Sequence, residues 1–110
     1  MSEILTLRDR KDAKVKAIRA ALPGIERALA KYALLHSGRF ILFGSAVTDR
    51  LHYESDIDVL ADFPREQLGA ALDFAHALGA EKDVPVDAIG LSQCKRVFLD
   101  RVLPHSRVCS

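Results

Sequence analysis

Apolar residues recur every three or four positions along the first third of the chain. The stripe consists of Val15, Ile18, Leu22, Ile25, Leu29 and Tyr32. This spacing places side chains on one face of an α-helix. Pro23-Gly24 falls inside the stripe, and proline is tolerated in the first turn of a helix but not in its interior. The pattern therefore predicts two helices, over about residues 7–22 and 24–36.

The pattern changes to that of β-strands in the middle of the chain. Phe40 to Phe43 form a continuous apolar run, short enough for a buried strand, which stops at the small pair Gly44-Ser45. Ten residues later, Asp56-Ile57-Asp58 leads into a period-2 alternation that ends at Phe63. The sequence predicts two strands here, the first of which ends in a turn.

The last part of the chain contains four further segments. The expected elements are a helix from Pro64 to Gly79, a strand over Val84–Ile89, a helix from Ser92 to Pro104 and a short strand at Arg107–Cys109. Pro85 indicates the start of its strand or an edge position. Asp62 lies just before Pro64, and we expect it to cap the helix that follows.

Composition limits the class of protein. The chain has 110 residues, of which 49% are hydrophobic, and its mean hydropathy is +0.06. These values are typical of one globular domain, in which the predicted N-terminal helices span about 7–36 and the rest of the core spans about 39–103. No signal peptide is evident, and no apolar run approaches the roughly 20 residues of a membrane span. We therefore expect a cytoplasmic protein without membrane contact.

The charges are nearly balanced, with 16 basic and 15 acidic residues and a net charge of +1. Nothing in this balance attracts the whole protein to nucleic acid or to an anionic membrane, so nucleic acid is not an expected partner. Basic residues gather in the first predicted helix, mixed with two acidic ones: Arg8, Asp9, Arg10, Lys11, Asp12, Lys14, Lys16 and Arg19. We interpret this segment as a solvated helix face, with a docking surface for a partner as the alternative. Cys94 and Cys109 lack CxxC or Cys/His spacing, which indicates free thiols.

Three aspartates are the candidate chemical groups. Because side chains alternate along a strand, Asp56 and Asp58 share one face, about 6 to 7 Å apart. Asp87, on the third predicted strand, points away from its apolar neighbours. Carboxylates of this kind suit Mg²⁺, which is usually shared with substrate phosphates. If Asp87 is not the third carboxylate, Asp83 is the next candidate.

Gly44-Ser45 adds a feature that suits phosphate. Gly44 has no side chain and lets a phosphate approach the backbone, while the Ser45 hydroxyl and nearby amides can donate hydrogen bonds to it. A pair of aspartates alone is a weak signal, since solvated acidic pairs are common. The combination with Gly44-Ser45 at a fixed spacing is much more specific, and it favours nucleotide chemistry.

These residues resemble a known signature. Gly44-Ser45, ten intervening residues and then Asp56-x-Asp58, in the context FGS…SDIDVL, look like the motif of the polymerase-beta-like nucleotidyltransferases, specifically the minimal nucleotidyltransferase (MNT) group. The resemblance covers about residues 20–103. It implies an α+β (α/β) fold, in which a small mixed β-sheet has helices packed on one side as in the polymerase beta palm.

The resemblance also implies an activity and a partner. Such enzymes transfer a nucleoside monophosphate from a nucleoside triphosphate to a hydroxyl and release pyrophosphate. Asp56, Asp58 and Asp87 would be catalytic residues that bind two Mg²⁺ ions, and Gly44 and Ser45 would bind the nucleotide. MNT proteins are often antitoxins paired with a HEPN-domain toxin RNase, which some of them adenylylate on a tyrosine.

The chain departs from the family pattern at one point. Many members carry an Arg-Gly pair soon after Gly-Ser, whereas Thr48-Asp49 occupies those positions here, and Arg50 is a candidate replacement for the cation. The leading hypothesis is Mg²⁺-dependent transfer of AMP from ATP to a hydroxyl of a HEPN-type partner, with Asp87 also acting as base. The departure motivates a second hypothesis, a catalytically weak or inactive antitoxin that neutralises its partner by binding. The third is transfer to a small molecule of the aminoglycoside type.

The length of the chain bears on the acceptor. Larger relatives append a helical domain that contacts the acceptor, and 110 residues leave no room for one. We therefore expect a partner protein or a second copy of the chain to supply the acceptor surface.

Overall fold

The structure is a computed structural model that describes residues 7–48, 50–52 and 54–109. It begins with one long helix, α1 (Leu7–Leu35), which contains Pro23. The prediction of two helices is wrong here. Pro23 is exposed, whereas Leu22 and Ile25 on either side of it are buried against the sheet. Burial of this continuous apolar stripe outweighs the single helical hydrogen bond that proline removes.

A four-stranded mixed sheet forms the centre of the molecule. Its strands are β1 (Arg39–Phe43), β2 (Ile57–Asp62), β3 (Val86–Gly90) and β4 (Arg107–Val108), in the spatial order β3-β2-β1-β4. β1 pairs antiparallel with both β2 and β4, and β2 pairs parallel with β3. A parallel pair needs a crossover connection, which α3 (Arg65–Lys82) supplies.

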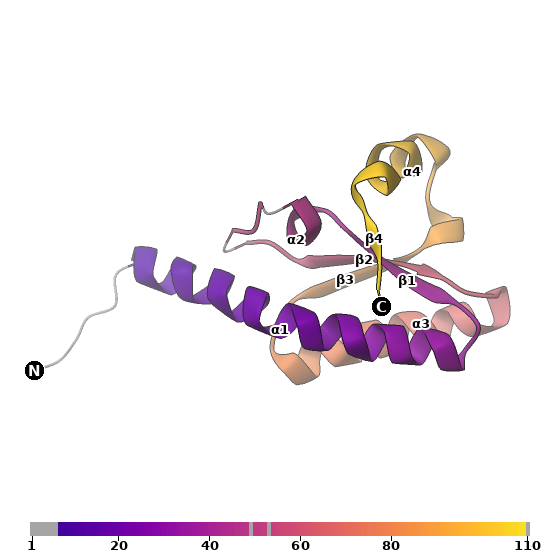
Figure 1. The fold of residues 1–110 in the computed structure, drawn as a ribbon, viewed down its shortest axis with the longest axis horizontal. Helices are drawn as coiled ribbons and strands as arrows, with labels where there is room; N and C mark the ends of the chain where they lie inside the picture. The colour runs from indigo at the N-terminus through magenta and orange to yellow at the C-terminus, as the bar shows by residue number, and fades with distance from the viewer. Residues whose placement is uncertain (1–6, 49, 53, 110) are drawn as a thin grey trace, which may run out of the picture.

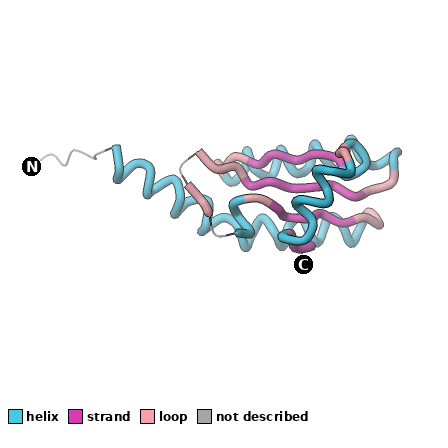
Figure 2. The backbone as a smooth tube through the Cα atoms, turned by 90° about the horizontal axis from the view of Figure 1, so that it is seen from above, coloured by secondary structure: helices cyan, strands magenta, loops and turns pink. Residues whose placement is uncertain are grey.

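Helices cover both faces of this sheet, as Figure 1 shows with α1 and α3 below it and α4 (Arg96–Val102) above it. The larger core lies between the sheet and α1 and α3, and its fully buried side chains include Ile25, Leu29, Phe40, Leu42, Ile57 and Val59. A smaller core lies under α4 and is built on Ile41, Phe43 and Leu60. The two long helices lie on one side, as expected, and α4 packs on the other together with Leu91 and Cys94 of the segment before it. In Figure 2 it lies across the strands.

The predicted fold class is confirmed, and most differences concern where elements begin and end. α3 does not stop at Gly79 but continues to Lys82, and Asp83, whose φ of 55° lies in the left-handed region, caps its end. Gly79 is buried, and a Cβ there would collide with Val86. This glycine therefore serves close packing of α3 on β3 rather than a stop.

The C-terminal segment contains two short helical turns that the sequence did not predict. A 3-10 turn at Leu91–Gln93 follows β3, and α4 begins only at Arg96 instead of Ser92. Another 3-10 turn covers Leu103–His105. Nearer the middle of the chain, the short helix α2 (Ser45–Thr48) follows β1. The expected short strand near the C-terminus is present as β4.

Asp62 does not cap α3. The N-cap of that helix is Pro64, with no side-chain hydrogen bond, and the Asp62 carboxylate instead accepts a hydrogen bond from Arg39 Nε at 2.8 Å. The two residues are directly opposite each other on β1 and β2, and this register explains the pair. Among the described residues, no helix is long and apolar enough to cross a membrane.

A test of the continuous helix is Pro23→Ala. Alanine restores the missing backbone donor in the middle of α1, so we expect the free energy of unfolding to rise by about 1–3 kcal/mol. Chemical denaturation followed by circular dichroism measures the change. Loss of stability in this variant would contradict a single helix and favour two helices that need the proline between them.

Candidate active site

The candidate site lies where one strand ends and its two neighbours begin. Phe43, the last residue of β1, is paired with Asp58 near the start of β2. Asp58 is in turn paired with Asp87 near the start of β3. Because side chains directly across two strands point to the same face of a sheet, this register puts the Asp58 and Asp87 carboxylates side by side.

Asp56 joins these two residues. One carboxylate oxygen from each of Asp56, Asp58 and Asp87 can be chosen so that all three lie within 4.8 Å of one another. Asp56 and Asp87 are exposed and Asp58 is half-buried. β2 begins at Ile57, so Asp56 lies one residue before the strand rather than within it. The structure thus brings together the three aspartates that the sequence singled out.

Crowding of these carboxylates has an electrostatic cost. Burial, and after it the negative charges of Asp87 and Asp56, together raise the pKa of Asp58 to about 6. A carboxylate held in such surroundings is poorly stabilised as an anion. A bound cation beside it would reverse this effect, because an opposite charge favours the ionised form.

Gly44 provides the space beside Asp58. Its φ is +77°, a backbone conformation that L-residues with side chains rarely adopt. A Cβ at this position would also collide with the Asp58 carboxylate. Glycine is therefore required at this position for two reasons: the turn after β1 needs a positive φ, and the Asp58 carboxylate leaves no space for a side chain.

Ser45 begins α2 directly after Gly44. At the end of this turn, Thr48 Oγ1 donates a hydrogen bond to the Gly44 carbonyl oxygen at 3.1 Å. The Thr48 hydroxyl thus stabilises the turn and does not stand in for the guanidinium of the Arg-Gly pair. The other half of that departure, Asp49, lies outside the described residues.

The segment before Asp56 is ordered by a residue that the sequence reasoning missed. Ser55 is buried, at 4% exposure, and its Oγ accepts a hydrogen bond from the His52 amide at 2.9 Å. The Ser55 amide donates to the His52 carbonyl oxygen at 2.9 Å. This reciprocal pair closes a tight turn and fixes the direction in which the chain enters Asp56. The sequence feature that could have indicated this turn is the serine directly before Asp56.

A second backbone bond fixes the same corner. The amide of Ile57, which stands between the two aspartates, donates to the Pro85 carbonyl oxygen at 2.8 Å. The start of β3 is thereby held against the start of β2, and Asp87 follows two residues later. Asp83, the reserve candidate for the third carboxylate, is not part of the cluster but ends α3.

A model of the nucleotidyltransferase domain matches residues 22–105, which is most of the chain. The chain belongs to the nucleotidyltransferase domain family. The matched segment of this nucleotidyltransferase includes all five candidate residues and excludes the first half of α1. Neither the curated proteins nor the solved structures contain a significant match to the chain.

The aspartates of this nucleotidyltransferase fit a divalent metal ion. They offer three hard oxygen donors from three different positions, a donor set that suits Mg²⁺ or Mn²⁺ and leaves room for water and substrate oxygens. The carboxylates repel one another, as the raised pKa of Asp58 shows, and the positive charge of such an ion would offset this repulsion. Phosphoryl chemistry of the nucleotidyl-transfer type is what this arrangement can support.

Asp58→Asn tests the repulsion in metal-free protein. The pKa of Asp58 is about 6 when folded and 3.8 in its ordinary state, so protonation stabilises the fold below pH 3.8 and this contribution is lost as pH rises through 6. Because solvent screens a half-buried group, we expect the variant to be more stable than wild type by only about 1 kcal/mol at pH 7.5, with little difference at pH 4. Urea denaturation at both pH values in the presence of a chelator measures this.

Asp62→Asn is the matched control, since Asp62 lies on the same strand but is paired with Arg39. It should lose at most about 1 kcal/mol, as exposed ion pairs do. Addition of millimolar Mg²⁺ should stabilise wild type and Asp62→Asn but not Asp58→Asn. Equal gains for all three proteins would contradict a metal site at Asp58.

Gly44→Ala tests the close approach. The added methyl group meets the Asp58 carboxylate and the positive φ is strained, so we expect a loss of about 1–3 kcal/mol in the free energy of unfolding. Gly69→Ala is the control because a Cβ there meets nothing within 4 Å, and in the middle of α3 it should be neutral or stabilising. Thermal unfolding compares the two, and similar melting temperatures would contradict the assigned role of Gly44.

Proposed function

We propose that this nucleotidyltransferase domain transfers AMP from ATP to a hydroxyl of a partner protein in a Mg²⁺-dependent reaction. The observation that carries the proposal is the convergence of Asp56, Asp58 and Asp87 beside Gly44 at the ends of three strands. Nucleotidyl transfer follows from the family; the nucleotide, the metal and the acceptor are the parts proposed here.

The residues take different roles in this reaction. The acceptor oxygen attacks the α-phosphorus of ATP, the bond to the β-phosphate oxygen breaks, and pyrophosphate leaves. Asp87 is exposed and accepts the proton of the attacking hydroxyl, while Gly44 and Ser45 bind the triphosphate. Asp56, Asp58 and Asp87 would hold two Mg²⁺ ions, which would neutralise the negative charge of the phosphates.

A partner protein is the proposed source of the acceptor. Asp56 and Asp87 are exposed, so a hydroxyl on another protein can reach the carboxylate cluster. By its resemblance to the MNT group, the partner is proposed to be a HEPN-type toxin and the domain its antitoxin. A hydroxyl on that partner, such as a tyrosine side chain, would be the group that is modified.

Co-expression with the protein encoded beside this one tests the proposal. We expect intact-mass spectrometry to show AMP-sized increments on that protein with wild type and with Asp62→Asn. With Asp58→Ala the modified fraction should fall at least about a hundredfold, because a metal ligand is lost. An unmodified partner in all three samples would contradict transfer to it.

A binding function without catalysis is the second candidate. It is favoured by the turn after β1, where Thr48 bonds to Gly44 at the place where relatives carry a cation. In this case Asp56→Ala/Asp58→Ala protein would still bind and silence its partner. Loss of neutralisation in that double variant, with binding retained, would exclude the second candidate.

A further inference from the structure

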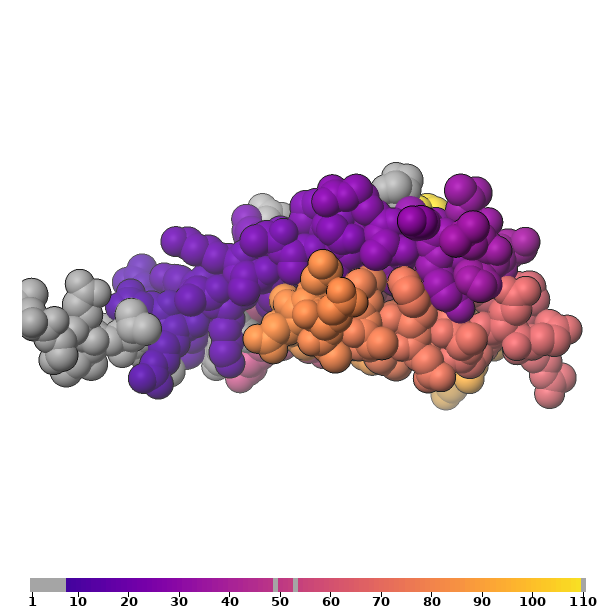
Figure 3. All heavy atoms as spheres, turned by 90° about the horizontal axis from the view of Figure 1, so that it is seen from below, coloured from indigo at the N-terminus to yellow at the C-terminus, as the bar shows by residue number. Residues whose placement is uncertain are grey.

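The first half of α1 extends beyond the rest of the molecule. Figure 1 and Figure 3 show it continuing past the sheet and past α3, which lies beside the second half. Between residues 8 and 17 no side chain is fully buried, and the large core begins with Ile18. A mostly exposed helix is marginal in water at this length, so contact with another molecule would stabilise it.

This extension carries a concentrated positive charge. Residues 8–19 hold six basic side chains and two acidic ones, a charge of +4 in a chain whose net charge is +1. The remaining residues together are therefore acidic. The family match begins only at residue 22, so this segment lies outside the matched domain.

The extension borders the chain segments that lead into the carboxylate cluster, although Asp58 and Asp87 themselves point to the opposite face of the sheet. Lys14 and Ile18 line one cavity together with Pro85, whose carbonyl oxygen bonds to the amide between the two aspartates of β2. Lys16 lines a second hollow with Leu51, which belongs to the segment that leads to Asp56. A molecule bound along this helix would lie next to the two chain segments that carry the carboxylates.

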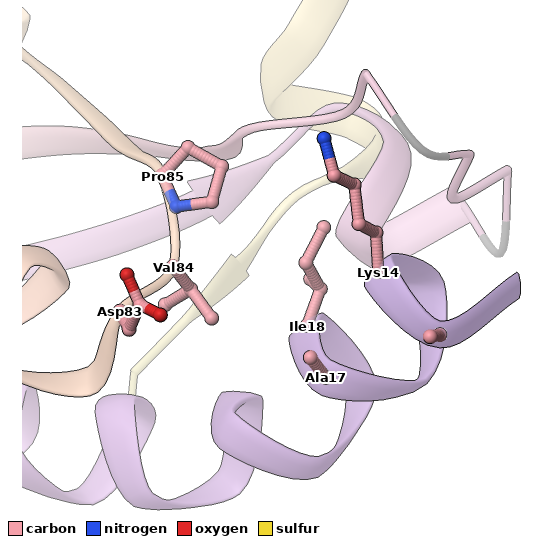
Figure 4. A pocket seen from close by; sticks show the side chains of 7 residues that line it. Lys14, Ala17, Ile18, Asp83, Val84 and Pro85 are labelled. Atoms are coloured by element: carbon pink, nitrogen blue, oxygen red, sulfur yellow. The ribbon is translucent and has the colours of Figure 1, made fainter. Parts of the chain in front are cut away.

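The cavity beside Pro85 has a volume of about 400 Å³ and a mixed lining. Figure 4 shows Ile18 and Val84 facing each other across it, with Lys14 on one side and Asp83 on the other. Ile18 and Val84 are buried, so an apolar side chain that enters the cavity would contact only their exposed atoms, and Lys14 can pair with a carboxylate next to it on the side away from Asp83.

We infer that residues 8–19 of α1 and this cavity form a docking surface for an acidic segment of the acceptor protein, which places an apolar side chain in the cavity against Ala17 and Pro85. The inference rests on the proposed function for the identity of the occupant. Charge complementarity and the apolar walls both favour a polypeptide. Nucleic acid is disfavoured because residues 8–19 contain no aromatic side chain for base stacking and the positive charges are interrupted by Asp9 and Asp12.

Binding of a glutamate–tyrosine copolymer, which offers carboxylates, aromatic side chains and hydroxyl acceptors, tests the surface. We expect Lys14→Glu/Lys16→Glu to raise the Kd measured by fluorescence anisotropy at least about tenfold. Arg27→Glu/Lys31→Glu is the matched control, because it makes the same change of charge at exposed positions in the second half of the same helix. Equal losses in the two double variants, or tighter binding of an RNA of equal charge by wild type, would overturn the inference.

The cavity is tested separately by filling it. Ala17 lines it and is exposed, so leucine there adds volume without loss of helix propensity. Ala17→Leu should weaken copolymer binding about tenfold, whereas Ala20→Leu, exposed on the same helix outside the cavity, should not. Unchanged binding by Ala17→Leu would remove the cavity from the surface.

Transfer of labelled AMP to the copolymer separates the two proposals. If both hold, Lys14→Glu/Lys16→Glu raises KM with kcat unchanged. If wild type binds with the expected discrimination but transfers nothing, the docking surface stands and the proposed function fails for this acceptor. If wild type transfers AMP and both double variants have the same KM, the function stands and the docking surface is wrong.

Discussion

The parallel pairing of β2 with β3 is the constraint on which the candidate site depends. It sets Asp58 directly across from Asp87, and the antiparallel pairing with β1 sets Phe43 on the other side of Asp58. A shift of one residue between β2 and β3 would turn one of the two carboxylates to the opposite face. The register is held by the apolar alternation on the large-core face and by the bond from Ile57 to Pro85.

The same register makes the carboxylate cluster electrostatically unfavourable when no metal ion is bound. Three carboxylates converge beside Gly44, and the pKa of Asp58 is raised because burial and like charges oppose its ionisation. Structures keep such unfavourable arrangements mainly where they serve chemistry. Apolar side chains of β1 and β2 are buried on the other face of the sheet, and their burial offsets the electrostatic repulsion at the cluster.

Helix α1 links the fold to the proposed recognition of a partner. Its second half packs on the sheet through Ile25 and Leu29, both fully buried, while its first half carries the excess positive charge beside the cavity. Pro23 lies between the two halves on the exposed side. One continuous helix can thus stabilise the nucleotidyltransferase domain and present a surface beside the chain segments that lead into its carboxylates.

The sequence alone determined the strands, the helix–sheet alternation and the three aspartates with Gly44, because period-2 and period-3.6 patterns and motif spacing are local properties. Only the tertiary structure decided that α1 continues through Pro23, since burial of the stripe on a sheet is what outweighs the lost hydrogen bond. It likewise decided that Gly79 serves packing and that Asp62 pairs with Arg39. Contacts between residues far apart in the chain determine these outcomes, and no local pattern records them.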